Sequence, residues 1–159
     1  MFHVSRRSAA LPLLSLLAAA LAFAAAQARA PQNGSDKEKE EPPFHAYKGV
    51  HIGMTAEEAR KLLGNPTDKG DKQDFYSFND KEACQVYYDD AHKVFAVSVT
   101  YLGGGSVPVP KSVLGTDIEA KQDGSLYKLV RFPKAGYWVS YTRTAGDEPM
   151  TIIAMQRIQ

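Results

Sequence analysis

The sequence predicts an α+β domain in which a short helix packs on an antiparallel sheet. One observation is a helix-like stretch, residues 56–63, with start and stop signals at its two ends. Another is the alternation over residues 94–102, which has the period of a strand with one buried face. Several shorter strand-like runs, separated by turn residues, surround that strand. The face of 94–102 that is expected to be buried carries Phe95, Val97, Val99 and Tyr101.

Residues 1–30 have the composition of a cleaved signal peptide. Arg6 and Arg7 precede an apolar run over 11–26, and small residues at 26–30 provide a cleavage site. The apolar run is shorter than the roughly 20 residues that span a bilayer, and no cysteine lies near the cleavage region for a lipid anchor. Residues 31–43 are polar and of mixed charge, which predicts a disordered leader. We therefore expect an exported protein, periplasmic or extracellular.

The charge and cysteine content narrow the class of protein further. Without residues 1–30 the chain carries 16 Lys and Arg against 18 Asp and Glu, which is no electrostatic footprint for nucleic acid. A peripheral contact with a membrane stays open. The single cysteine, Cys84, excludes an intramolecular disulfide, so the domain must rely on its hydrophobic core. Cys84 alternates with Val86 and Tyr88, and we expect it to be a small buried core residue.

The helix over 56–63 has a complete set of end signals. Thr55 and Glu58 have the spacing of a capping box, in which each side chain accepts a hydrogen bond from the backbone of the other. Gly64 can supply the left-handed position after the helix, and Pro66 prevents its continuation. A helix of two turns is marginal alone in water, so we expect it to dock on the sheet. The residues expected to dock are Ala59, Leu62 and Leu63.

Further strands are predicted on both sides of 94–102. They cover residues 75–78, 84–88, 126–132, 136–142 and 150–158. The segment 107–111 contains two prolines, so no long helix is expected in the second half. A loose repeat, in which Leu-Gly precedes Tyr by 13 residues at both Tyr76 and Tyr127, allows the domain (44–159) to consist of two tandem degenerate units, 44–105 and 106–159.

Residues 50–66, Val-His-Ile-Gly-Met-Thr-Ala-Glu-Glu-Ala-Arg-Lys-Leu-Leu-Gly-Asn-Pro, resemble the SmpA/OmlA (BamE) type of domain. They are also similar to the β-lactamase inhibitory protein fold, in which a related unit occurs in tandem. The shared pattern is Gly-x-Ser/Thr, a short helix, Leu-Gly-x-Pro and an antiparallel sheet. The resemblance implies an exported, non-enzymatic module that serves as a binding scaffold. The chain departs from these families in having neither an anchoring cysteine nor a disulfide.

The polar residues form no pattern that is typical of catalysis or metal binding. His45, His51 and His92 lack metal-ligand spacing with one another or with Asp89 and Asp90. No serine lies in a Gly-x-Ser-x-Gly turn, and the glycines at 103–105 are not followed by the Lys-Ser/Thr pair of a phosphate loop. We therefore expect no cofactor, no metal and no enzyme activity.

Aromatic residues on the predicted strands are the strongest indication of function. Tyr, Trp and Arg are the residues enriched at binding hot spots. Along 136–142, Trp138 shares the more polar face with Ser140 and Thr142, and we expect that face to be exposed. Trp138 is the first binding candidate. The patch around it is predicted to include Tyr127, Leu129 and Arg131.

The sequence as a whole predicts an exported binding module. Its partner is expected to be a protein of the cell envelope, bound by a sheet face with aromatic and basic residues. Two alternatives stay open: a small periplasmic hydrolase with a site assembled from distant residues, and a cell-envelope structural protein that self-associates. The identity of the partner and the oligomeric state are open as well.

Overall fold

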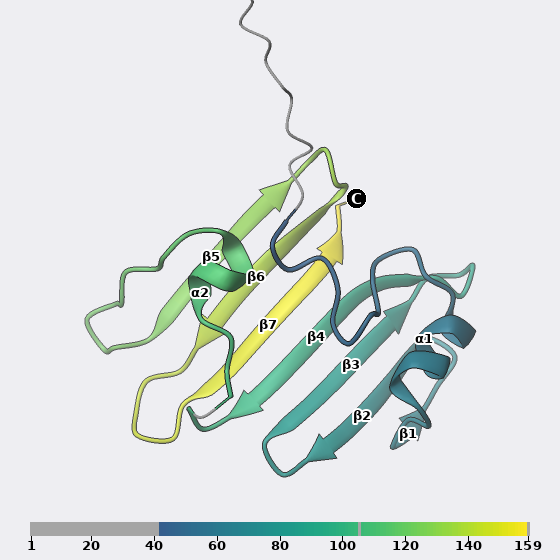
Figure 1. Ribbon diagram of the computed structural model, residues 1–159, viewed down its shortest axis with the longest axis horizontal. Coiled ribbons are helices and arrows are strands. Elements are labelled where there is room, and N and C mark those ends of the chain that lie inside the picture. The colour runs from purple at the N-terminus through teal and green to yellow at the C-terminus, as the bar shows by residue number, and fades with distance from the viewer. Residues whose placement is uncertain (1–41, 105, 159) are drawn as a thin grey trace, which may run out of the picture. The chain divides into compact units, whose positions relative to one another are not determined.

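The computed structural model describes residues 42–104 and 106–158 (Figure 1). Helix α1 spans Ala56–Leu63 and helix α2 spans Pro110–Leu114. The strands are β1 (Asp68–Lys69), β2 (Gln73–Asn79), β3 (Glu82–Tyr88), β4 (Val94–Leu102), β5 (Leu126–Phe132), β6 (Tyr137–Arg143) and β7 (Met150–Arg157). The expected signal peptide, residues 1–30, lies outside the described residues, as does most of the expected leader, residues 31–41.

The α+β prediction is wrong, because the described chain is predominantly β. Its seven strands form one antiparallel sheet, whereas its helices have eight and five residues. α2 is short because Val109 before it is extended, Pro110 lies in its first turn and Gly115 ends it in a left-handed conformation. Two such helices cannot form a separate layer over seven strands. No helix of the described residues is long and apolar enough to cross a membrane.

The strands follow the order β1-β2-β3-β4-β7-β6-β5 across the sheet. β4 and β7 pair at its centre, where Val99 lies opposite Ile153. β1 and β5 are the two edges, and they differ greatly, since β1 has two residues and β5 has seven. Within the described residues, β5 is therefore the long free edge of the sheet.

Side chains alternate between two faces of the sheet. We call one the covered face, because α1, α2 and the segment 42–54 all lie across it (Figure 1). Its buried side chains include Val86, Val97, Val99, Val139, Ile153 and Met155. We call the other the uncovered face, because no described helix lies on it. In the order of the strands across the sheet, from β2 to the β5 edge, its residues include Phe75, Gln85, Tyr87, Ser98, Ala154, Gln156, Trp138, Ser140, Tyr127, Leu129 and Arg131.

The predicted bounds and the predicted capping box of helix α1 are confirmed. The Thr55 hydroxyl accepts from the Glu58 N–H, and the Glu58 carboxylate accepts from the Thr55 N–H at 2.9 Å. Gly64 has a positive φ of 85°, but its ψ of −158° lies outside the left-handed helical region. The expected docking of Leu62 is wrong, since its side chain is 51% exposed. At about 100° per residue, the helix turns Ala59 and Arg60 toward the sheet and Leu62 away from it.

The predicted strands 94–102 and 126–132 are confirmed with the same bounds. The other four strands are present, each with at least one end that differs by one or two residues. The difference at β2 is instructive, because this strand begins at Gln73 and includes Asp74. Asp74 is completely buried, although its charge favours a loop in any reading of the sequence.

The alternation predicted for β4 fails at Phe95. Tyr87 pairs with Ala96 and Tyr88 with Val94, so the register shifts and Phe95 is an extra residue on its strand. Such a bulge re-aims the side chain that it inserts. Phe95, which alternation places on the covered face, therefore lies beside the ring of Tyr87 on the uncovered face, with the ring centroids 6.2 Å apart.

Candidate binding face

The uncovered face has a composition suited to binding. In the paired positions of β2, β3, β4, β7, β6 and β5, this face carries aromatic rings together with Ser, Thr and Gln side chains. It carries no Asp or Glu in these positions. Arg131 is the one charged residue in these positions. Antiparallel sheets often leave one face to solvent, but that face is then usually polar along its whole length. Aromatic rings on such a face are typical of an interaction surface.

Three aromatic side chains surround a hollow on this face. Tyr87 comes from β3, Phe95 from the bulge in β4 and Trp138 from β6. The hollow has a volume of about 340 Å³, and Ser98 and Gln156 also line it. All three rings are partly exposed. The site therefore offers apolar rings with hydroxyl and amide groups at their borders, which suits an inserted apolar side chain of another molecule.

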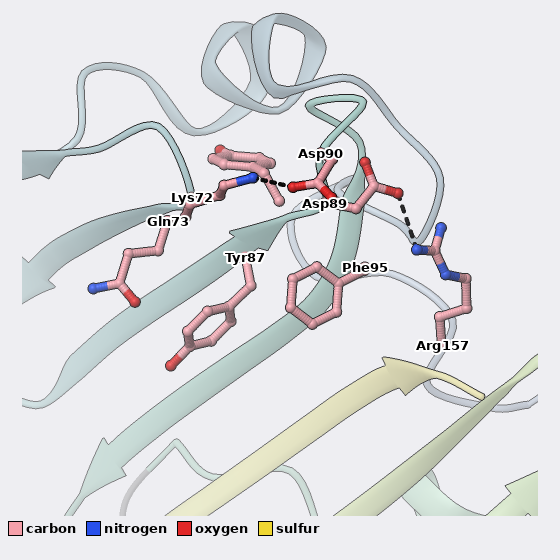
Figure 2. A pocket seen from close by; sticks show the side chains of 8 residues that line it. Lys72, Gln73, Tyr87, Asp89, Asp90, Phe95 and Arg157 are labelled. Carbon is pink, nitrogen blue, oxygen red and sulfur yellow. Dashed lines mark hydrogen bonds and ion pairs between the residues drawn. The ribbon is translucent and has the colours of Figure 1, made fainter. Parts of the chain in front are cut away.

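A second hollow continues from the first, since Tyr87 and Phe95 line both (Figure 2). It has a volume of about 450 Å³. Its outer border is charged: Lys72 pairs with Asp90, and the guanidinium of Arg157 lies 2.9 Å from the carboxylate of Asp89. Both pairs are at the surface. The arrangement is an apolar centre with a rim of charges that already have partners.

The acidic groups of this rim are held in their ionised form. Backbone N–H donors, above all that of Lys93, and the Arg157 guanidinium lower the pKa of Asp89. A hydrogen bond and an ion pair with Lys72 lower the pKa of Asp90. A general acid needs the opposite shift, toward neutral pH. These carboxylates are therefore suited to a rim of fixed charges rather than to proton transfer.

The structure brings together the binding candidates predicted from the sequence. Trp138 lies directly opposite Arg131 on the neighbouring strand, and Tyr127 lies opposite Thr142, all on the uncovered face. Tyr127 is 53% exposed and Leu129 is 37% exposed. Their position next to the aromatic hollow extends the surface from the centre of the sheet to the β5 edge. Whether they bind a partner stays a prediction.

Of the three rings around the hollow, the sequence predicts only Trp138 as a binding residue and misses Tyr87 and Phe95. The expected alternation places Phe95 on the buried face. The sequence interrupts the apolar–polar alternation here, because Val94, Ala96 and Val97 are all apolar. In the structure all three are buried, whereas strict alternation would bury every second residue. An apolar run of this kind is consistent with a bulge, but it does not identify the residue that the bulge turns outward.

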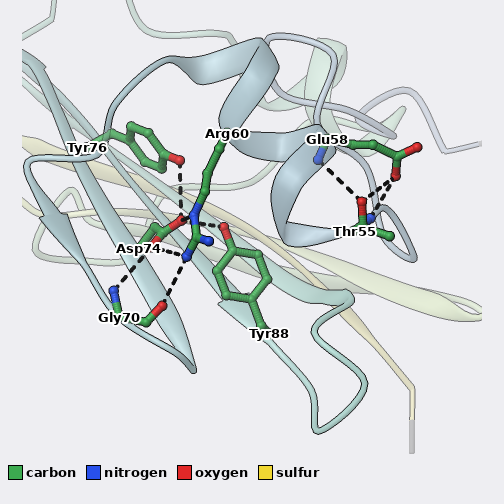
Figure 3. A network of polar contacts seen from close by, with 7 residues as sticks. All are labelled: Thr55, Glu58, Arg60, Gly70, Asp74, Tyr76 and Tyr88. Atoms are coloured by element: carbon green, nitrogen blue, oxygen red, sulfur yellow. Dashed lines mark hydrogen bonds and ion pairs between the residues drawn. The ribbon is translucent and has the colours of Figure 1, made fainter.

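The covered face holds a polar cluster that the sequence did not reveal (Figure 3). From α1, Arg60 donates to the carboxylate of Asp74 at 2.7 and 3.0 Å and to the carbonyl of Gly70 at 3.1 Å. Asp74 also accepts from the hydroxyl of Tyr88 at 2.7 Å, the hydroxyl of Tyr76 at 3.4 Å and the N–H of Gly70 at 3.2 Å. A buried carboxylate with this many donors has its charge fully compensated.

The electrostatics of this cluster indicate a structural role. Burial alone would raise the pKa of Asp74, but hydrogen bonds from Arg60, Tyr88 and the Gly70 N–H outweigh burial and hold the pKa below its ordinary value. Burial, with Asp74 close by, raises the pKa of Tyr76 to about 12. Each of these groups is therefore held in its ordinary protonation state with an internal partner. The cluster fastens α1 to β2 and β3.

The other polar candidates lie apart from one another. His45 bonds to the carbonyl of Pro42, His51 to the carbonyl of Ile52, and His92 is in the turn before β4. In the described part of the chain, no three His, Cys, Asp or Glu side chains are grouped as metal ligands would be. Cys84 confirms its interpretation as a buried core residue, and burial raises the pKa of its thiol to about 12.

Comparisons with known proteins add little to this picture. No protein-family model matches the chain, and no curated protein matches it. The chain is similar to the crystal structure of a DUF4309 family protein (YjgB) from Bacillus subtilis subsp. subtilis str. 168, at 11% identity and a TM-score of 0.44. That similarity covers 71% of this chain and 86% of the other. A similarity this distant carries no information on function.

Proposed function

We propose that the protein is an exported binding module that docks a protein partner of the cell envelope on the uncovered face of its sheet. One observation carries the proposal: Trp138, Tyr127 and Arg131 lie on neighbouring strands of a face that no described helix covers, beside the aromatic hollow. Residue types enriched at binding hot spots are thus gathered in one place.

The layout of the face supports a protein as the partner. Protein interfaces typically have a desolvated aromatic centre and a polar rim that keeps water out. Here Tyr87, Phe95 and Trp138 provide the centre, and the ion pairs of Asp89 and Asp90 lie at the border. The hydroxyl of Tyr87 donates to Gln85 at 2.8 Å, which holds its ring in place before binding. A pre-positioned ring loses little conformational entropy when a partner docks.

Binding is better supported than catalysis. An active site needs convergent titratable groups with pKa values shifted toward neutrality. The carboxylates at the rim have lowered pKa values and existing partners, and the Arg60–Asp74 cluster is saturated by its own hydrogen bonds. The signal-peptide-like sequence of residues 1–30 supports export, and the resemblance of residues 50–66 to BamE-type domains supports a scaffold role.

Capture of a partner from a cell-envelope extract tests the proposal. The immobilised protein is compared with Trp138→Ala and Tyr127→Ala, and Leu62→Ala on α1 is the matched control because Leu62 is also exposed but lies away from the uncovered face. A hot-spot truncation costs about 2 kcal/mol, so we expect affinity for the captured protein to fall about thirtyfold in Trp138→Ala. Thermal melting verifies that each variant is folded. Equal retention by all four proteins would contradict the proposal.

A further inference from the structure

The edge strand β5 is built differently from the other edge of the sheet. β1 has only two residues, both charged and exposed, which is a usual way to protect an edge from pairing. β5 has seven residues, Leu-Tyr-Lys-Leu-Val-Arg-Phe, and no proline. Its inner side pairs with β6, and no described strand pairs with its outer side. An edge of this length presents a row of backbone N–H and C=O groups that another strand can use.

The segment that leads from α2 to β5 does not occupy this edge by backbone pairing. Its hydrogen bonds to itself join Gly124 to Lys121 and Lys121 to Ser125. It is attached to β5 through a side chain, since the Lys128 ammonium donates to the hydroxyl of Thr116 and the carbonyl of Asp117, both at 3.4 Å. Lys128 points to the covered side of the sheet. On the uncovered side, the Lys121 ammonium lies 5.8 Å from the centroid of the Tyr127 ring. These contacts lie at the Tyr127–Lys128 part of the edge and leave the part around Leu129 and Arg131 open.

The charges of β5 determine which kind of strand can pair favourably with it. Lys128 and Arg131 are its charged residues, and neither forms an ion pair with a carboxylate of the described chain. A second copy of β5 would bring four cations to one strand pair, and like charges across a pair are destabilising. A strand that carries carboxylates would instead supply both cations with an ion-pair partner, in addition to the hydrogen bonds that Lys128 already donates to Thr116 and Asp117. Charge complementarity therefore favours an acidic segment over a second copy.

We propose that an extended, acidic segment of a partner protein adds to the sheet antiparallel to β5. This inference rests on the proposed function and specifies its mode. Antiparallel pairing places the segment's residues opposite 131, 130, 129 and 128 in turn, so acidic residues belong opposite Arg131 and Lys128 and apolar residues opposite Val130 and Leu129. The recognised pattern is acidic–apolar–apolar–acidic, followed by an aromatic residue opposite Tyr127.

A synthetic peptide provides the probe, acetyl-Thr-Glu-Val-Val-Glu-Phe-Thr-amide, titrated into the purified protein by calorimetry. The peptide is expected to bind, and Arg131→Glu is expected to weaken binding at least fivefold, because a carboxylate then faces a carboxylate. Exchanging the first glutamate of the peptide for lysine should restore binding to Arg131→Glu. Arg143→Glu is the matched control, since Arg143 is an exposed arginine at the end of β6 whose pairing places it on the other face. It should bind the original peptide as the unaltered protein does.

N-methylation of alternate peptide bonds separates edge pairing from docking on the face. It removes the N–H groups that a strand needs for pairing, so the methylated peptide should not bind. Equal binding of the methylated peptide would overturn the inference. An absence of peptide binding up to about 1 mM would also overturn it. If Trp138→Ala still weakens partner capture about thirtyfold in that case, the proposed function stands without this mode. A dimer in sedimentation that Arg131→Glu alters would assign the edge to a second copy and also overturn it.

Discussion

The strands β1–β4 and the strands β5–β7 are attached to their helices by different forces. In the first group, α1 reaches the sheet through an arginine, and the ion pair of Arg60 with the buried Asp74 has a separation of 2.7 Å. In the second group, α2 docks through Val113 and Leu114, both buried and apolar. α1 also has a full capping box, whereas the N-cap of α2, Val109, has no side-chain hydrogen bond.

The two groups also end differently at the edges of the sheet. The first ends in the short charged strand β1, and the second ends in the long strand β5, with Tyr127 and Leu129 exposed on its uncovered side. The comparison suggests a division of roles. Directional polar contacts hold the first group in one geometry, and the second group carries the free edge and the candidate binding residues. We expect stability to depend most on the first group and binding most on the second.

The largest expected effect is on the buried ion pair. Arg60→Met keeps the apolar stem but leaves Asp74 ionised, buried and without a cation, so we expect the free energy of unfolding to fall by about 3 kcal/mol. Urea unfolding followed by the fluorescence of Trp138, the single tryptophan, measures it. Arg131→Met is the control, because that arginine is exposed and has no ion-pair partner among the described residues, and it should change stability by no more than about 0.5 kcal/mol. Equal effects would remove the distinction between the two groups.

The attachment of α2 should be weaker but still measurable. Leu114→Ala deletes a buried side chain of the helix, and we expect a loss of about 2 kcal/mol, at the low end for such truncations because α2 is short. Val109→Ala, at an exposed position next to the same helix, should have almost no effect. A loss from Leu114→Ala larger than that from Arg60→Met would reverse the comparison.

Acid should weaken the first group through Asp74. The folded-state pKa of Asp74 lies below the value of about 3.9 expected in the unfolded chain. Its contribution is therefore complete above the unfolded pKa and is lost as the pH falls through the folded pKa. In Asp74→Asn the free energy of unfolding should depend less steeply on pH below about pH 5. Asp90→Asn, at an exposed ion pair, should retain the steep dependence; a flat curve for the unaltered protein would contradict the assignment.

The smallest expected effects concern the helix caps. Thr55→Ala removes the capping hydrogen bond of α1 and should lower the free energy of unfolding by about 1 kcal/mol. Val109→Ser supplies α2 with a hydroxyl at the position where it has none, and should raise the free energy by up to about 1 kcal/mol. Opposite signs in thermal or urea unfolding would support the difference between the helices. A loss of stability in both variants would count against it.

Local features of the sequence predicted what is local in the structure. The capping box of Thr55 and Glu58 depends on residues three apart, and the strand 126–132 depends on a short run of neighbours between turn residues, so both could be predicted directly. The proportion of helix to strand could not be predicted in this way, because α2 has five residues and begins at a proline, so it has no periodic signal of its own.

The rest of the site depends on contacts between distant residues. Arg60 lies in the predicted helix 56–63 and Asp74 lies just before the predicted strand 75–78, and only the fold brings the partly exposed arginine onto the buried carboxylate. Trp138, Tyr127 and Arg131 could be predicted to share a face because they follow the alternation of paired strands. Phe95 could not, because a bulge breaks that alternation.

Hydrogen–deuterium exchange, resolved strand by strand with and without the captured partner, tests most directly where the protein binds. We expect slower exchange in β5 and β6, at and beside the free edge, with α1 and β2 unchanged. Slower exchange confined to α1 and β1–β2, with β5 unaffected, would contradict this expectation.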